Sequence, residues 1–233
     1  MTPTPGMVDA TEPLVQVWPL FGLHIATPRL VLTPVRDAHL PELVDAVLAG
    51  IHDPADMPFS VPWTDAPRDI LVSETAKHQW RLRAGVSPGE WTVNFAVLHG
   101  GRVIGVQDLA ARSFPLLRRV ETGSWLTQAA HGRGFGTEMR SAVLQFAFDH
   151  LGATSAVSGA AVWNAASLGV SRRLGYVPNG TSLAEARRGE VQVLQNLLLA
   201  REDFVRPDWV AEVRGLQAAL ALLTPGPLPG TAG

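Results

Sequence analysis

The sequence lacks several residue types and patterns on which particular mechanisms depend. None of its 233 residues is a cysteine, which excludes disulfide bonds, cysteine metal sites and catalysis through an acyl-cysteine intermediate. Neither sign of charge dominates, because 19 basic and 21 acidic residues give a net charge of −2. This balance argues against a general nucleic-acid-binding protein and against a membrane-surface protein.

Two kinds of segment are also missing. No run of about eighteen apolar residues occurs, so we expect no membrane span. Residues 1–28 contain neither a basic residue nor an unbroken apolar stretch, and we therefore expect no signal peptide and a cytoplasmic protein. The seven histidines are scattered without the spacing of a zinc site, so we expect no metal.

The chain does contain enough apolar material for a buried core, since 46% of its residues are hydrophobic. Proline and glycine gather near both ends, which predicts a mostly flexible tail over residues 1–20 and a disordered tail over 224–233. Between them we find no linker or repeat. We expect one domain over residues 21–205 and a C-terminal extension over 206–223 that is helical.

Hydrophobic periodicity predicts a mixed α/β domain. Asp37 is the expected N-cap of the first helix, and Gly175 the C-cap of the last. The helix over 134–151 is apolar on two sides and should pack on a sheet. The expected strands cover residues 29–34, 91–98, 102–109, 119–127, 154–160 and 191–200, the helices 37–49, 69–82, 134–151 and 164–174, and an irregular loop 50–67.

Residues 131–137 (HGRGFGT) lie between a predicted strand and this helix. Their glycines allow a tight turn with converging N–H groups, and the helix N-terminus adds positive potential, so the segment suits a pyrophosphate. A Walker A loop would need Lys where Thr137 stands, and a dinucleotide-binding loop would need Gly or Ala at that same position. A glycine-rich turn without a ligand is the remaining alternative.

The same segment resembles the pyrophosphate motif of the GNAT acyltransferase superfamily, Arg/Gln-x-x-Gly-x-Gly/Ala, with His131 at its first position. Residues 27–34 (TPRLVLTP), 121–126 (ETGSWL), 164–167 (NAAS) and 171–176 (SRRLGY) are similar to segments of its RimJ/RimL branch, in the same order. The resemblance implies a splayed central sheet flanked by helices. It also implies an acyl-CoA-dependent N-acyltransferase that acts by direct transfer.

The family's fold implies where the acyl-CoA donor binds. Pantetheine would lie between the splayed strands against Trp125, Leu126 and Thr127. Asn164 and Ser171 would complete the donor site, although Asn164 is equally placed to cap its helix. The pyrophosphate would rest on the loop formed by His131, Gly132, Arg133, Gly134, Phe135, Gly136 and Thr137.

Two residues match catalytic positions of the RimL-like enzymes. Glu121 would accept the amine proton, directly or through water. The alternative is that Glu121 is a solvated carboxylate at the strand edge. Ser167 would stabilise the departing thiolate, because Ser171 replaces the tyrosine that serves as acid in other members. Strand alternation places Glu121 on the same face as Trp125. Trp63 in the 50–67 loop is either a core anchor or part of the acceptor pocket.

The substrates are less defined than the fold. The acceptor implied is an amine of a protein N-terminus or a small molecule. Acetyl-CoA is the usual donor, while residues 57–63 (MPFSVPW), 136–140 (GTEMR) and 171–173 (SRR) are similar to an actinobacterial subgroup associated with succinyl-CoA. A non-catalytic acyl-CoA sensor or carrier is one alternative and a nucleotide-binding interaction module another. A homodimer or higher homo-oligomer is left open.

Overall fold

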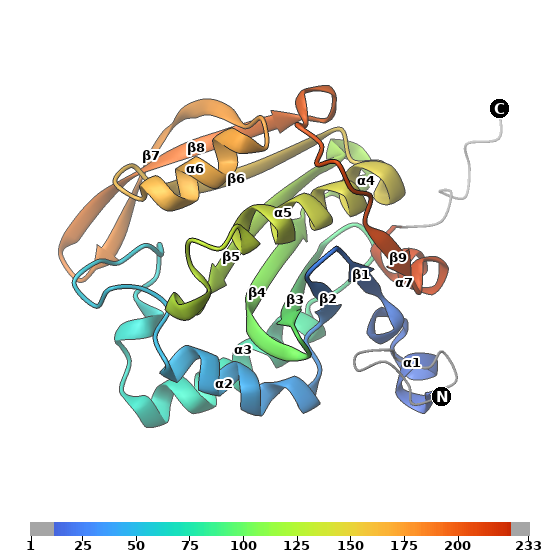
Figure 1. The fold of residues 1–233 in the computed structure, drawn as a ribbon, viewed down its shortest axis with the longest axis horizontal. Coiled ribbons are helices and arrows are strands. Elements are labelled where there is room, and N and C mark those ends of the chain that lie inside the picture. The colour runs from blue at the N-terminus through green and yellow to red at the C-terminus, as the bar shows by residue number, and fades with distance from the viewer. Residues whose placement is uncertain (1–11, 225–233) are drawn as a thin grey trace.

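The computed structural model describes residues 12–224. They form a nine-stranded sheet of order β7-β8-β6-β5-β4-β3-β2-β1-β9, which Figure 1 shows as an open, twisted layer. Neighbouring strands are antiparallel apart from the parallel pair β5 and β6. The strands are β1 (His24–Ala26), β2 (Val31–Pro34), β3 (Trp91–His99), β4 (Arg102–Ala111), β5 (Arg119–Leu126), β6 (Ser155–Ala161), β7 (Val177–Arg187), β8 (Glu190–Ala200) and β9 (Glu212–Arg214).

Helices cover both faces of the sheet. On one face α5 packs on β4 and β5 with α6 beside it, and on the other α2 and α3 pack on β4 and β3. A π-helical turn over Phe146–Leu151 continues α5. The helices are α1 (Pro13–Val17), α2 (Leu40–Leu48), α3 (Arg68–Ala84), α4 (Phe114–Leu117), α5 (Phe135–Gln145), α6 (Ala165–Arg173) and α7 (Leu216–Leu223).

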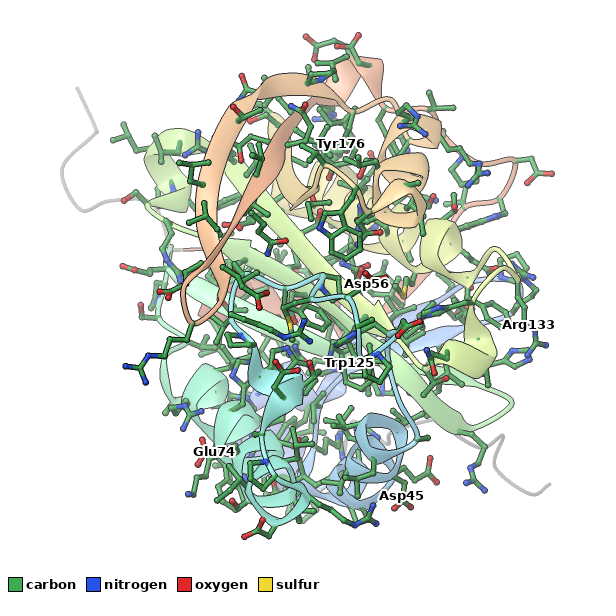
Figure 2. All side chains as sticks on the ribbon, turned by 90° about the vertical axis from the view of Figure 1, so that its left-hand side faces the viewer. Asp45, Asp56, Glu74, Trp125, Arg133 and Tyr176 are labelled. Carbon is green, nitrogen blue, oxygen red and sulfur yellow. The ribbon has the colours of Figure 1, made fainter. Side chains whose placement is uncertain are left out.

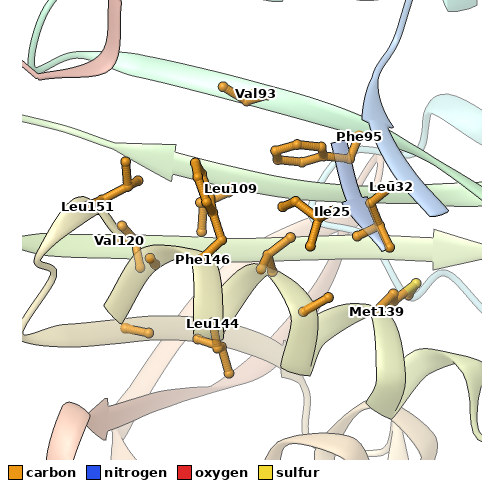
Figure 3. Packing of buried hydrophobic residues seen from close by; sticks show 14 of the residues in the cluster. Ile25, Leu32, Val93, Phe95, Leu109, Val120, Met139, Leu144, Phe146 and Leu151 are labelled. Carbon is orange, nitrogen blue, oxygen red and sulfur yellow. The ribbon is translucent and has the colours of Figure 1, made fainter. Parts of the chain in front are cut away.

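The main core lies between the sheet and α5. Alternation along β3 sends Phe95 toward α5 and Ala96 toward α2. In Figure 3, Met139 of α5 and Phe146 of the π-helical turn point toward side chains from the strands, Leu109 among them. Because this core fixes α5 against β4 and β5, it also fixes the loop that precedes α5.

Most of the expected elements are confirmed, and several details differ. Asp37 does not cap a helix: it accepts hydrogen bonds from Trp80 Nε1 at 3.1 Å and Arg83 Nη2 at 2.9 Å, and α2 begins at Leu40. The sequence interpretation missed β7, an edge strand that contains Pro178. Nearly all of its residues are exposed, so it shows no alternation of burial.

The two ends of the chain are more ordered than expected within the described range. Residues 13–17 form α1, and Leu20 is buried in the core. The extension over 206–223 is not wholly helical, because β9 first pairs with β1. Trp91 Nε1 then donates to the carbonyl of Leu223 at 2.8 Å and holds α7 in place. Of the tails predicted over residues 1–20 and 224–233, residues 1–11 and 225–233 lie outside the described residues.

Candidate active site

The strands β5 and β6 diverge in the middle of the sheet. They pair in parallel only at their beginnings, where the last register pair joins Glu121 to Val157. Beyond it β5 follows β4, and β6 follows β8. Ser158 Oγ donates to the carbonyl of Thr122 at 3.0 Å and closes the ladder where the strands part. The expected splay of the central sheet is thus confirmed.

A cleft of about 1200 Å³ occupies this gap. Its walls come from β5, β6, α6, the 131–137 loop and the 50–67 loop. Figure 2 shows Asp56 and Trp125 between the β7–β8 hairpin and helices α2 and α3. The residues predicted from the sequence that line the cleft are Glu121, Trp125, Leu126, His131, Gly132, Gly134, Phe135, Gly136, Thr137, Asn164 and Ser167.

The 131–137 loop has the conformation that its glycines allow. Gly132 has φ of +71° and Gly134 has φ of +81°, both in the region that favours glycine. A Cβ added to Gly132 would have no atom within 4 Å, so open space faces it. His131 Nε2 lies 3.0 Å from the carbonyl oxygen of Leu126 and ties the loop to β5. The loop amides and the start of α5 can therefore face an anion in the cleft.

An ion pair that was not anticipated from the sequence braces this loop. Arg29 Nη2 lies 2.6 Å from a carboxylate oxygen of Glu138, a buried residue in the first turn of α5. Thr27 Oγ1 donates to the same carboxylate at 2.6 Å. Arg29 Nη1 donates to the carbonyl of Arg133 at 3.0 Å. The segment before β2 thus holds both α5 and the loop in position.

Three residues predicted to bind the donor lie outside the cleft lining. The amide of Thr127 donates to the carbonyl of Ile104 at 2.9 Å and so completes the sheet. Arg133 stacks its guanidinium 4.9 Å from the centre of the Phe135 ring. Ser171 is fully buried, accepts from Arg140 Nη1 at 2.9 Å and has no surface available to a ligand.

Glu121 is exposed at the point where the strands part, and it has no hydrogen-bonding partner among the described residues. Asp108 of β4 lies on the same face, opposite Gly123. Its carboxylate accepts from Asn94 Nδ2. Burial raises the pKa of Asp108 to about 7, with a further increase from the charge of Glu121 and an opposing effect from Asn94. Two carboxyl groups therefore share this face, and the sequence interpretation identified only one.

The start of α6 forms the opposite wall. The side chain of Asn164 accepts from the amide of Ser167 at 3.0 Å, which confirms it as the N-cap. Asn164 and Ser167 both face the cleft. The Ser167 hydroxyl makes no hydrogen bond within the described residues, so it can point toward a ligand. Its carbonyl accepts from Ser171 Oγ at 3.2 Å, which links this wall to the interior.

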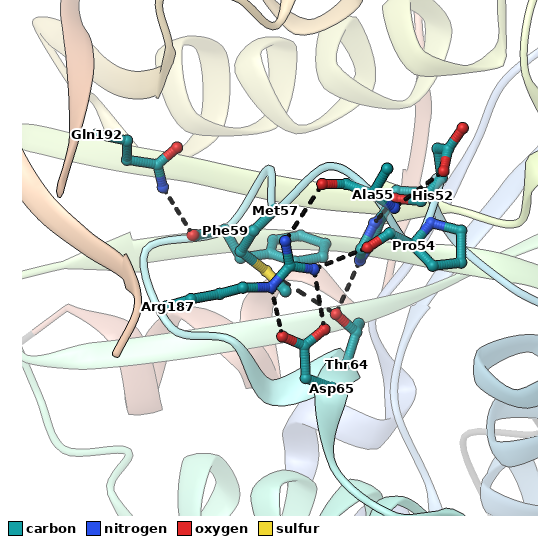
Figure 4. A network of polar contacts seen from close by, with 10 residues as sticks. His52, Pro54, Ala55, Met57, Phe59, Thr64, Asp65, Arg187 and Gln192 are labelled. Atoms are coloured by element: carbon teal, nitrogen blue, oxygen red, sulfur yellow. Dashed lines mark hydrogen bonds and ion pairs between the residues drawn. The ribbon is translucent and has the colours of Figure 1, made fainter. Parts of the chain in front are cut away.

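The 50–67 loop is held against the β7–β8 hairpin by the contacts in Figure 4. Arg187 Nε donates to Asp65 at 2.6 Å, and Arg187 Nη2 donates to the carbonyl of Pro54 at 2.8 Å. Gln192 Nε2 donates to the carbonyl of Phe59 at 2.9 Å. Because Phe59 lines the cleft, these contacts shape the part of the cleft that the 50–67 loop contributes.

Trp63 lies in this loop but does not line the cleft. Its ring lies 5.4 Å from that of Phe59 and 6.2 Å from that of Trp125, between centroids. It therefore packs beside two cleft-lining aromatic rings, but it is only half-buried and belongs to neither core cluster, so neither interpretation of Trp63 is confirmed. Within residues 12–224 no cluster of three or more potential metal ligands occurs, and no helix there is long and apolar enough to cross a membrane.

Solved structures with the same fold are numerous. RimL, the ribosomal L7/L12 alpha-N-protein acetyltransferase, in complex with coenzyme A is 18% identical, with a TM-score of 0.61 over 76% of this chain and 97% of that one. Mycobacterium smegmatis RimJ with CoA-disulfide is 18% identical, with a TM-score of 0.63 over 88% and 95%. A spermidine N-acetyltransferase SpeG chimera from Vibrio cholerae and hSSAT is 17% identical, with a TM-score of 0.59 over 77% and 99%.

These structures share the fold at low sequence identity. The family model for the acetyltransferase (GNAT) domain matches residues 29–177, which contain the splayed strands, the glycine loop and α6. Well over half of the chain is covered by this match. The chain therefore belongs to the GNAT acetyltransferase family.

Proposed function

We propose that the cleft is the active site of an N-acyltransferase that moves an acetyl group from acetyl-CoA to a primary amine by direct transfer. The observation that carries this proposal is the placement of the glycine loop, Glu121 and Ser167 around one cleft at the divergence of β5 and β6. An anion site and a solvent-accessible carboxylate are the parts that amine acylation by a CoA thioester requires. The catalytic unit corresponds to the domain predicted over residues 21–205.

The donor would lie along β5. Its pyrophosphate would accept hydrogen bonds from the loop amides around Gly132 and Gly134, at the N-terminus of α5. Its pantetheine arm would then follow the edge of β5 that β6 leaves, past Trp125 toward Glu121. This path supports the predicted roles of Leu126, His131, Phe135, Gly136, Thr137 and Asn164 as donor-site residues.

The acyl transfer itself would use two side chains. Glu121 accepts the proton that the amine loses as it attacks the thioester, directly or through a water molecule. Ser167, which lines the cleft, donates a hydrogen bond to the sulfur that departs. An accessible carboxylate at the point of divergence favours catalysis over the alternative of a non-catalytic acyl-CoA sensor.

The amine would enter from the end shaped by the 50–67 loop. Asp53 and Asp56 of this loop line the cleft together with Glu121, and these three carboxylates favour a cationic acceptor. RimL and SpeG are, by name, enzymes that acetylate a protein N-terminus and spermidine. Both acceptor classes are therefore part of the proposal. The proposal also includes succinyl-CoA as a second donor, a cytoplasmic location and a homo-oligomeric state.

A panel of ligands tests the donor and the acceptor in turn. The melting temperature is measured with acetyl-, succinyl-, malonyl- and free CoA, and stabilisation of about 2.7 kcal/mol is expected at 100 times the dissociation constant. CoA release is then followed with spermidine and with peptides that have a free N-terminus. No stabilisation by any CoA compound would contradict the proposed donor site. Stabilisation without CoA release would favour the sensor.

A further inference from the structure

One buried arginine faces the cleft without a counter-charge. Arg140 of α5 is 4% exposed and lines the cleft. Its Nη1 donates to Ser171 Oγ at 2.9 Å and its Nη2 to Ser124 Oγ at 3.2 Å. The Nε–H has no partner among the described residues, and no carboxylate of residues 12–224 pairs with the guanidinium. Among the described residues, two neutral hydroxyls are thus its only hydrogen-bond acceptors.

This arrangement is unfavourable for the protein without a ligand. A buried cation loses its hydration, and hydroxyl groups replace only part of it. In agreement, burial lowers the pKa of Arg140, although nearby Tyr176 has the opposite effect. A buried donor that the fold leaves unsatisfied, at the wall of a ligand cleft, indicates an acceptor supplied by the ligand.

The position of Arg140 along the cleft limits which ligand group this is. Arg140 lies six positions after Gly134, which is about 9 Å of helix beyond the glycine loop at ~1.5 Å per residue. On β5, Arg140 contacts Ser124. This residue lies two positions from Thr122, where the strands part, which is about 7 Å of strand at ~3.3 Å per residue. Arg140 therefore lies between the pyrophosphate loop and the point of acyl transfer, beside the middle of the donor.

We propose that Arg140 is a donor-positioning residue whose guanidinium donates a hydrogen bond to an amide carbonyl oxygen of the pantetheine arm. This inference rests on the proposed acyl-CoA site. The arm is neutral but carries amide oxygens in the stretch between phosphate and sulfur, and a cationic donor makes a stronger hydrogen bond to such an oxygen than a neutral one does. The same guanidinium holds Ser124 of β5 and Ser171 of α6, so it sets the width of the slot through which the arm passes.

Binding measurements on Arg140→Met test the contact, because methionine keeps much of the length of the side chain and removes the donor and the charge. Arg172→Met is the matched control, since Arg172 is an exposed arginine on α6 outside the cleft lining. Titration calorimetry gives the dissociation constants of wild type and both variants for free CoA, acetyl-CoA, succinyl-CoA and ADP. ADP has the pyrophosphate and lacks the arm.

We expect Arg140→Met to weaken free CoA, acetyl-CoA and succinyl-CoA alike by about tenfold to a hundredfold, the range for losing a hydrogen bond to a charged group. ADP binding and the control should change less than twofold. The melting temperature of the ligand-free variant should equal or exceed that of wild type, because a buried uncompensated charge has been removed. A purely structural arginine would instead lower it.

Three results would overturn the assignment. Unchanged affinity for all CoA compounds would remove Arg140 from the donor site. A loss confined to succinyl-CoA would show that Arg140 binds the acyl carboxylate and not the arm. An equal loss for ADP would show that it acts through the glycine loop. Failure of wild type to bind any CoA compound would instead refute the proposed function itself.

Discussion

Replacement of Asp108 by asparagine tests the electrostatics of the sheet face that Asp108 shares with Glu121. Burial raises the pKa of the Asp108 carboxyl from 3.8 to about 7, and the charge of Glu121 adds to this increase. A carboxyl whose pKa is higher in the folded protein holds its proton more tightly there than in the unfolded chain. Its contribution to stability is therefore complete below about pH 4 and is lost as the pH rises through about 7.

The size of the effect follows from the two pKa values. A difference of about three units corresponds to about 4 kcal/mol at ~1.36 kcal/mol per unit. Partial exposure of the carboxyl makes this an upper bound. Asp108→Asn removes the titration and leaves an amide oxygen that can accept from Asn94. We expect equal stability at about pH 4, and a variant that is more stable by up to about 4 kcal/mol at about pH 8.

The assay is urea denaturation of both proteins across this pH range. His24, whose pKa burial lowers to about 4, destabilises the folded state as the pH falls below about 6.5 in either protein. The difference in free energy of unfolding between wild type and variant cancels the contribution of His24 and leaves that of Asp108. Parallel pH profiles for the two proteins would mean that Asp108 is ionised with an ordinary pKa, and the argument that burial raises this pKa would fail.

Three further substitutions separate the parts of the site. Gly132→Val should weaken CoA binding. Gly100→Val is its control, because both glycines have a positive φ and at both an added Cβ would have no atom within 4 Å. Equal CoA affinity in the two variants would contradict the role of the loop. Arg187→Met should raise KM for the amine and leave the dissociation constant for CoA unchanged. Arg188→Met, at an exposed arginine outside the cleft lining, should change neither quantity. An unchanged KM in both variants would show that the hairpin contact does not shape acceptor binding. Glu121→Gln should reduce turnover by about 10²–10⁴-fold near neutral pH and partly recover at high pH, where the free amine is abundant; full turnover at every pH would assign the base elsewhere.

The sequence predicted those parts of the site that a short segment determines. The glycine loop, the Asn164 cap and the two walls around Glu121 and Ser167 each depend on residues within a few positions of one another, and all of them line the cleft. The fold followed for the same reason, since alternation and helical periodicity are local. The strand β7 was missed because both of its faces are largely exposed and its residues carry no periodic signal.

The contacts that were missed join distant positions. Arg29 lies 109 residues from Glu138, and Arg140 lies 31 residues from Ser171. Neither pair has a pattern that could be recognised before the sheet brings the partners together. The family resemblance placed Ser171 in the donor site, whereas in the structure its hydroxyl is buried, accepts from Arg140 and donates to the carbonyl of Ser167.

On the proposed function, we expect donor binding and acceptor choice to depend on different contacts around the cleft. The donor end is built from the glycine loop, α5 and a buried carboxylate paired with Arg29, all of which are anchored in the main core. The acceptor end is built from the 50–67 loop and the β7–β8 hairpin, which meet mainly through partly exposed contacts of Arg187. Exposed ion pairs contribute only about 0–1 kcal/mol each. Substitutions in the loop or the hairpin can therefore change the amine that is accepted without disturbing the donor site, while changes at Arg29 or Glu138 should affect every donor equally.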